Sequence, residues 1–325
     1  MIDLRPTRLR KLLNSLPELR VGVIGDFFLD AYFDCDPSLD EVSLETGKTC
    51  YQVVRQRRQA GAAGTVAANL RALGVGVVEA VGYCGDDGEG YELRRAMRGL
   101  GLDLTGFITV PDRFTPTYGK PCYIDSRKRG QPVLEELERL DTKNRRPTPS
   151  RLQNEIIDHI HSRLAHWDAL VLLDQVSEAN CGVLTSRVRR AITSALAHRS
   201  LPVALADART RIGDFKGVML KPNQYEAMAA LGAEGRPSLK ASRIHAQTLS
   251  ARTGRPVFLT LGSKGILVAD GNSIAHIPAL RVKGPIDTVG AGDSCSAAIS
   301  STLAVGATLI EAATFASLVA SVTVQ

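Results

Sequence analysis

Residues 287–294 carry the clearest chemistry in the sequence. They read Asp-Thr-Val-Gly-Ala-Gly-Asp-Ser and lead into an Ala-rich stretch of helical character. Small residues at Gly290, Ala291 and Gly292 leave backbone N–H groups bare at a helix N-terminus, where the positive end of the helix dipole points. This arrangement holds an anion, or the charge that grows on a phosphoryl group in transit. Asp293 stands inside it, so we expect a general base that acts on a hydroxyl beside the phosphate, rather than an N-capping Asp.

Three further segments place polar or small residues after apolar runs. Asp26 ends the apolar run 20–26 and Asp30 follows four residues later; a carboxylate there suits the hydroxyls of a polyol, because each oxygen accepts two hydrogen bonds, or it caps a turn. Gly61 and its neighbours allow backbone to approach a ligand at a helix start, or to pack tightly on a sheet. Asn223 and Glu226 have the spacing of a capping box.

The elements that position these residues alternate between strand and helix. Short apolar runs end near each motif, and segments with helical periodicity lie between them, which favours a doubly wound, mostly parallel sheet flanked by helices. In such a sheet, ligands bind beyond the carboxyl ends of the strands. The expected strands are 20–26, 77–82, 169–173, 203–206, 217–220, 257–261 and 266–269, and the expected helices are 66–73, 87–100, 186–198 and two within 291–323 that break near Gly306.

Two stretches interrupt this alternation. Residues 31–60 and 107–140 lack helical periodicity and contain alternating runs, which predicts a small β-sheet lid inserted into one domain spanning 1–325. The polar segment 141–151 then returns the chain to the main sheet. An inserted lid also offers a strand edge for pairing, so a homodimer through the lid is a further expectation.

Composition narrows the class of protein. The chain has 325 residues, 44% hydrophobic and 23% charged, which is ordinary for a globular protein and excludes a disordered, collagenous or coiled-coil chain. The net charge of +6 is mild and scattered, so a nucleic-acid partner is not expected. No apolar window reaches the length of a membrane span or a signal peptide, and the six cysteines form no CxxC pair, so we expect a cytoplasmic protein with reduced thiols.

Five motifs in order resemble the PfkB/ribokinase family of carbohydrate kinases, and the resemblance covers nearly the whole chain. They are GDFFLD (25–30), AGAAGTVAANLRALG (60–74), KPNQYE (221–226), TLGSKG (260–265) and DTVGAGDS (287–294). Within the family, the chain most resembles the kinase half of the bifunctional heptose 7-phosphate kinase/heptose 1-phosphate adenylyltransferases. Family members usually continue briefly past the position of Gln325.

The resemblance implies a ribokinase-like fold, ATP as phosphate donor and a role for each motif. Asn223 approaches the phosphates, Glu226 organises Mg²⁺ largely through water, and Asp287 lies in a region that binds a monovalent cation such as K⁺ in several relatives. Two departures stand out: Ala62 replaces a Gly, and Thr65 replaces an Asn that contacts the sugar. The implied sugar-binding residues are Asp26, Asp30, Gly61, Ala62, Thr65, Lys120 and Arg139, and the implied nucleotide-binding residues are Asn223, Glu226, Arg209, Thr260, Gly262 and Gly265.

The expected activity is transfer of the γ-phosphate of ATP to a sugar hydroxyl. A heptose 7-phosphate-like acceptor, phosphorylated at its anomeric hydroxyl, is the first expectation. Two alternatives stay open: a ribokinase- or fructokinase-like enzyme for an unphosphorylated sugar, and a non-catalytic regulator that binds sugar or nucleotide on the same fold. An NAD-dependent oxidoreductase is set aside, because no G-x-G-x-x-G follows the first strand.

Overall fold

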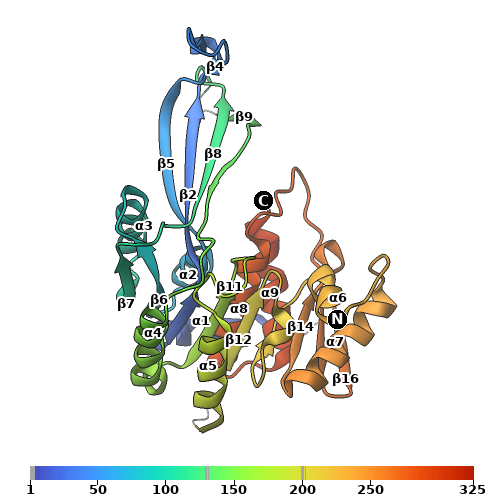
Figure 1. The fold of residues 1–325 in the computed structure, drawn as a ribbon. Coiled ribbons are helices and arrows are strands. Elements are labelled where there is room, and N and C mark those ends of the chain that lie inside the picture. Colours follow the sequence, from blue (N-terminus) through green and yellow to red (C-terminus); the bar gives the residue numbers. More distant parts are fainter. Residues whose placement is uncertain (1–3, 129, 131, 199–200, 202) are drawn as a thin grey trace.

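The computed structural model describes residues 4–128, 130, 132–198, 201 and 203–325. A nine-stranded sheet forms the centre of the main domain (Figure 1). Its strands are parallel from β7 to β14, and β15 and β16 are added antiparallel. In spatial order they are β16 (Ser273–Ile277), β15 (Ile266–Asp270), β14 (Val257–Thr260), β13 (Met219–Leu220), β12 (Val203–Ala208), β11 (Ala169–Asp174), β1 (Arg20–Gly25), β6 (Val77–Gly85) and β7 (Asp103–Val110).

Helices cover both faces of this sheet, so the central strands are buried on both sides and read as continuous apolar runs. One layer contains α1 (Pro6–Ser15), α2 (Ala63–Ala72), α3 (Gly88–Gly99), α8 (Ala291–Ala304) and α9 (Leu309–Thr323). The other contains α4 (Ser150–Arg163), α5 (Ser186–His198), α6 (Gln224–Leu231) and α7 (Leu239–Thr253). No helix in the described part of the chain is long and apolar enough to cross a membrane.

Helix α8 packs closely because its buried residues are small. Nine consecutive residues from Ser294 to Thr302 are buried, and they are Ser, Ala, Thr, Cys and Ile. The hydroxyls of Ser300, Ser301 and Thr302 donate to carbonyls one turn earlier, which satisfies them inside the core. The helix can therefore lie against β11 and β12 and carry its N-terminus to the carboxyl edge of the sheet.

A second sheet projects from the main domain as a narrow lid (Figure 1). Its central strands are β2 (Phe27–Cys35) and β8 (Thr117–Ile124), which pair in parallel, with β5 (Val53–Ala62) antiparallel to β2. Strands β9 (Val133–Glu136) and β10 (Leu140–Thr142) pair with β8, and the short β3 (Glu41–Val42) and β4 (Thr49–Cys50) form a separate two-stranded sheet.

The expected architecture is confirmed, with differences at the boundaries. Helix 186–198 and the break between the last two helices at Gly306 are found where the sequence placed them. The lid differs from the prediction at the start of each predicted range. Residues 27–30, before the first range, are already part of lid strand β2, and residues 107–110, at the start of the second, belong to β7 of the main sheet. The strand expected at 217–220 is limited to Met219–Leu220.

Candidate active site

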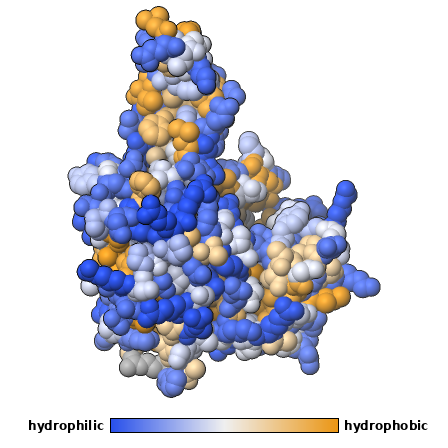
Figure 2. Space-filling view, viewed as in Figure 1, coloured by the Kyte–Doolittle hydropathy of each residue, from blue (hydrophilic) through white to orange (hydrophobic). Residues whose placement is uncertain are grey.

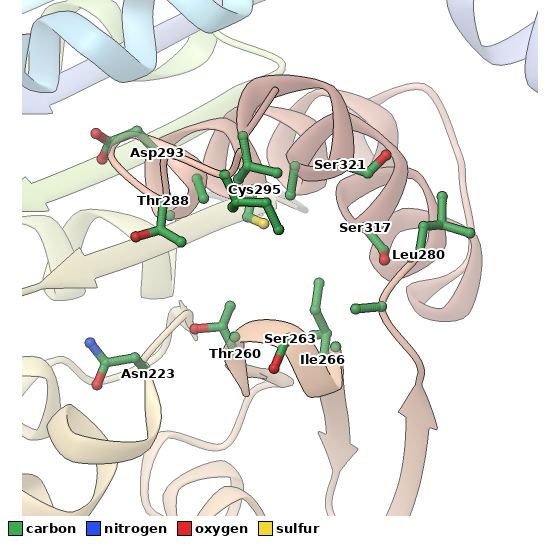
Figure 3. A pocket seen from close by; sticks show the side chains of 18 of the residues that line it. Asn223, Thr260, Ser263, Ile266, Leu280, Thr288, Asp293, Cys295, Ser317 and Ser321 are labelled. Carbon is green, nitrogen blue, oxygen red and sulfur yellow. The ribbon is translucent and has the colours of Figure 1, made fainter. Parts of the chain in front are cut away.

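Helix α8 begins at the edge of a large cavity. Gly290 adopts the left-handed conformation that ends the preceding loop (φ 77°), and the helix starts at Ala291. The cavity has a volume of about 820 Å³, and Ala291, Gly292 and Asp293 line it. Asp293 and Asn223 lie at one end of the cavity, and Leu280 and Ser317 lie at the other (Figure 3).

Asp293 has an altered proton affinity. Burial raises the pKa of this carboxyl to about 7, and the nearby carboxylate of Asp207 adds to the rise. The ammonium of Lys221 acts in the opposite direction, and Asp30 contributes a smaller rise. A carboxyl that titrates near neutral pH matches the requirement for a general base.

The residues predicted to bind the nucleotide line the same cavity as Asp293. They are Arg209, Asn223, Glu226, Thr260, Gly262 and Gly265. Gly265 is required by close packing, because a Cβ there would lie 2.0 Å from the carbonyl oxygen of Ile277. Thr260 is bridged to Asn223, and its amide donates to Pro222. The strand-turn at 260–265 and the start of α6 are therefore held together.

Asn223 and Glu226 form the capping box that their spacing predicts. Asn223 Oδ1 accepts from the amides of Tyr225 and Glu226, each at 2.9 Å, and Glu226 Oε2 accepts from the amide of Asn223 at 2.7 Å. The side-chain nitrogen Nδ2 of Asn223 and Oε1 of Glu226 take no part in these bonds. Burial raises the pKa of Glu226, as expected for a carboxyl without a full counter-charge.

These residues fit Mg²⁺ held mainly by a nucleotide and water. Magnesium keeps several waters and needs few protein carboxylates, and Glu226 supplies one that lines the cavity. Among the residues that the structure describes, no group of three or more His, Cys, Asp or Glu side chains forms a protein-only metal site. Asp287 is exposed and its Oδ1 accepts from the amide of Val289 at 2.9 Å; a role with K⁺ stays a prediction.

Two buried charged residues in the cavity were not among the predicted site residues. Lys221 is 4% exposed and Asp207 5% exposed, and Lys221 Nζ lies 3.0 Å from Asp207 Oδ2. Lys221 precedes Asn223 in the KPNQYE motif, and its position directly after a buried strand was the signal available in the sequence. The segment 279–286 and helix α9 provide the apolar end of the cavity, and neither was predicted to line the site.

Several residues that were predicted to bind the sugar lie on or next to the lid. Asp30 lies within β2, and its Oδ1 is 3.2 Å from Lys120 Nζ on β8. A Cβ at Gly61 would lie 2.6 Å from Asp30 Oδ2, so Gly is required where β5 passes this carboxylate. Thr65, in the first turn of α2, lies close to Gly290, whose added Cβ would be 3.9 Å from Thr65 Cγ2. Helix α2, which directly follows lid strand β5, thus reaches the turn before Asp293.

Arg139 and Arg209 meet at Tyr118, where lid and main domain come together. The Arg139 guanidinium lies 4.3 Å from the centre of the Tyr118 ring and binds Asp141 at 2.7 Å. Burial raises the pKa of Tyr118, while the charges of Arg209 and Arg139 oppose that rise. Tyr118 is the neighbour of Asp30 across the lid sheet. Two cations therefore lie beside the predicted sugar-binding carboxylate.

Asp26 is buried and is not among the residues that line the cavity. It is 4% exposed, and its two oxygens accept from the amides of Gln175, Val176 and Val183 at 2.7–3.1 Å. Burial and the neighbouring Asp174 raise its pKa to about 6. Its carboxylate fixes the loop that follows β11, which supports the cavity through Gln175.

Ala62 occupies a conformation that L-residues rarely adopt. Its φ is +53° and ψ is −116°, at the junction between lid strand β5 and helix α2. A Gly would adopt this conformation without a Cβ penalty. The departure from the family motif at this position therefore stores backbone strain at a junction between lid and main domain.

Comparison with known proteins agrees with this geometry. The profile described as pfkB family carbohydrate kinase matches residues 23–325. The chain is 28% identical over 322 residues to the Bifunctional protein HldE of Trichlorobacter lovleyi, covering 97% of this chain and 62% of that protein. It is 30% identical over 310 residues to the Bifunctional protein HldE of Hyphomonas neptunium, covering 94% and 60%. The chain thus spans about three fifths of the length of these curated relatives.

Solved structures of low sequence identity share the fold. The Arabidopsis thaliana ribokinase complexed with ribose and ATP superposes with a TM-score of 0.67 at 17% identity, covering 94% of this chain and 93% of that chain. The tetrameric inhibited form of phosphofructokinase-2 from Escherichia coli superposes with a TM-score of 0.71 at 17% identity, covering 94% of both chains. The ribokinase-like fold expected from the sequence is confirmed.

Proposed function

Because the chain belongs to the pfkB family of carbohydrate kinases, we propose that it transfers the γ-phosphate of ATP to the anomeric hydroxyl of a heptose 7-phosphate-like sugar. The observation that carries this proposal is the position of Asp293 in the cavity at the start of α8, with a pKa raised to about 7. A carboxylate beside the bare amides of 290–292 can take the proton of the attacking hydroxyl, while those amides stabilise the transferring phosphoryl group.

The lid would hold the acceptor. Asp30 accepts hydrogen bonds from sugar hydroxyls, and Lys120 keeps its carboxylate oriented by the contact at 3.2 Å. Gly61 and Thr65 border the acceptor on the side of α2. ATP would occupy the cavity along the carboxyl edge of the sheet, where Asn223 and Arg209 bind phosphate oxygens. Mg²⁺, held by the nucleotide and by Glu226 through water, would neutralise charge on the phosphates.

A cation beside the sugar site supports a phosphorylated acceptor. The guanidinium of Arg139 lies on Tyr118, next to Asp30, and Arg guanidinium groups suit bidentate binding of phosphate. One observation favours the alternative of an unphosphorylated sugar: Lys120, Arg139 and Arg57 on the lid each have a carboxylate partner, in Asp30, Asp141 and Asp34 respectively.

A coupled ATPase screen over sugars and sugar phosphates tests the proposal. We expect turnover with ATP and Mg²⁺ on a heptose 7-phosphate, and little turnover on the same sugar without its phosphate. In Arg139→Gln, KM for the phosphorylated acceptor should rise while KM for ATP stays unchanged; Lys128→Gln at the distal end of the lid is the matched control. Equal turnover of the unphosphorylated sugar would favour the ribokinase-like alternative, and sugar binding without ATP consumption would favour the regulator.

We also propose a homodimer through the lid. Apolar side chains are exposed on it, including Val42 at 68% and Leu44 at 103%, and Figure 2 shows hydrophobic residues gathered on the projecting lid. Strand β5 is an edge of the lid sheet over ten residues, and an unpaired edge of that length can pair with a second copy.

A further inference from the structure

A buried ion pair lies behind the start of α8. Lys221 Nζ is 3.0 Å from Asp207 Oδ2, and both side chains are almost completely buried. Asp207 Oδ2 also accepts from the hydroxyl of Ser296, on the first turns of α8, at 2.8 Å. The ammonium is therefore fixed between the end of β12 and α8, and removing either partner would leave a buried charge without compensation.

The ammonium lies against the turn that carries the proposed base. A Cβ built at Gly292 would lie 3.5 Å from Lys221 Nζ. Lys221, Gly292 and Asp293 all line the same cavity. The positive charge thus lies against Gly292, the residue that precedes Asp293.

We infer that Lys221 is a positioning residue for Asp293: its ammonium, fixed between the end of β12 and helix α8 and lying against the turn at Gly292, keeps the base ionised near neutral pH. This inference rests on the proposed function, in which Asp293 accepts the proton. Lys221 acts here through Asp293, and its charge rather than its packing carries the effect.

The charges around Asp293 support this inference. Burial and the carboxylates of Asp207 and Asp30 all raise its pKa, and Lys221 is the cation that lowers it. Glu226 and Arg209 line the same cavity, and the raised pKa of the Cys295 thiol, about 11, leaves that group uncharged at neutral pH. Without the ammonium, burial and the carboxylates of Asp207 and Asp30 would favour the protonated, inactive form of Asp293.

The experiment follows the Asp293 carboxyl directly in protein labelled with ¹³C at aspartate side chains. Asp293→Asn identifies the Asp293 resonance by its absence, and no substrate is required. In Lys221→Met the titration midpoint of Asp293 should rise by about one pH unit from that of the parent. In Asp207→Asn it should fall, because a nearby carboxylate is removed, and in Asp207→Asn combined with Lys221→Met it should lie above the midpoint of Asp207→Asn alone, because the ammonium is then missing as well.

Arg163→Met is the control, because it breaks the ion pair of another buried carboxylate, Glu79, outside the cavity; its Asp293 midpoint should equal that of the parent. If Lys221→Met does not fold, the comparison of Asp207→Asn with the double variant measures the effect of the same ammonium. The inference is overturned if removal of Lys221, in either background, leaves the midpoint unchanged or lowers it. If the midpoint fails to shift as expected while Asp293→Asn is inactive, only this inference is overturned. If Asp293→Asn retains full phosphotransfer activity, the proposed function is overturned instead.

Discussion

Lys120 Nζ lies 3.2 Å from Oδ1 of Asp30 and also donates to the hydroxyl of Tyr32 at 3.2 Å. This contact links the two central strands of the lid at the point where the sugar is proposed to bind. Because the side chains of Lys120 and Asp30 are both largely buried, the carboxylate of Asp30 is held in one orientation before a sugar binds. Such preorganisation lowers the entropic cost of binding.

The first prediction concerns Asp30→Asn. Loss of charge-assisted hydrogen bonds to the sugar should raise KM for the acceptor about 10- to 100-fold, with KM for ATP unchanged. Steady-state kinetics with each substrate varied in turn measure this. Asp125→Asn, which breaks the ion pair with Lys128 in the lid away from the site, should match the parent. An equal rise in both KM values would argue against a sugar-binding role.

The second prediction concerns the strained backbone at Ala62. Ala62→Gly should increase the free energy of unfolding by about 1 kcal/mol, because relief of the positive φ outweighs the greater freedom of Gly in the unfolded chain. Urea unfolding measures the change. Ala96→Gly, inside helix α3, should decrease stability by about 1 kcal/mol. Destabilisation by both variants would show that Ala62 is not strained.

The third prediction concerns stability in acid. Glu79 accepts hydrogen bonds from His159, Arg163 and Trp167; despite its burial, these partners lower its pKa to about 2. A carboxylate with a lowered folded-state pKa stabilises the fold above its unfolded-state pKa, and this contribution is lost as pH falls toward the folded-state value.

Glu79→Gln should therefore lose a pH-dependent contribution of about 3 kcal/mol between roughly pH 5 and pH 2. The difference in unfolding free energy between parent and variant should shrink as the pH falls through this window. Glu155→Gln, at an exposed pair with Arg151, should show a constant small difference. A constant difference for Glu79→Gln as well would contradict the account of this cluster.

The fourth prediction concerns the lid as an interface. Val42→Asp combined with Leu44→Asp should shift the protein from dimer to monomer in sedimentation velocity, because charges would replace exposed apolar side chains at the contact. Tyr91→Asp, at a residue of α3 that is 65% exposed outside the lid, should leave the assembly unchanged. A parent protein that sediments as a monomer at micromolar concentration would refute the dimer.

The main sheet and its helices could be predicted because their signals are local. Helix 186–198 follows from apolar periodicity, and the break at Gly306 coincides with a left-handed φ of 80°. The capping box at Asn223 and Glu226 is likewise set by residues three apart. These features depend on neighbours in the sequence, so one sequence is enough to find them.

The parts that could not be predicted depend on distant contacts. Lys221 resembles a surface lysine in a turn, and it is buried only because Asp207 of β12 and helix α8 enclose it. Asp26 resembles a ligand at a strand end, yet a loop about 150 residues later supplies three amides to its carboxylate. The start of strand β2 was not predicted, because its first residues continue the apolar run of β1 and only Asp26 separates the two strands.

The most direct test of the central claim is Asp293→Asn, assayed for both phosphotransfer and stability. Burial raises the folded-state pKa of Asp293 to about 7, so ionisation of this residue costs stability as the pH rises from its unfolded-state pKa to that value. The account predicts a loss of turnover of at least about 100-fold, with an unfolding free energy about 2–4 kcal/mol above the parent at about pH 8 and no gain at about pH 4. Near-parental turnover by the folded variant would contradict the assignment of Asp293 as the base.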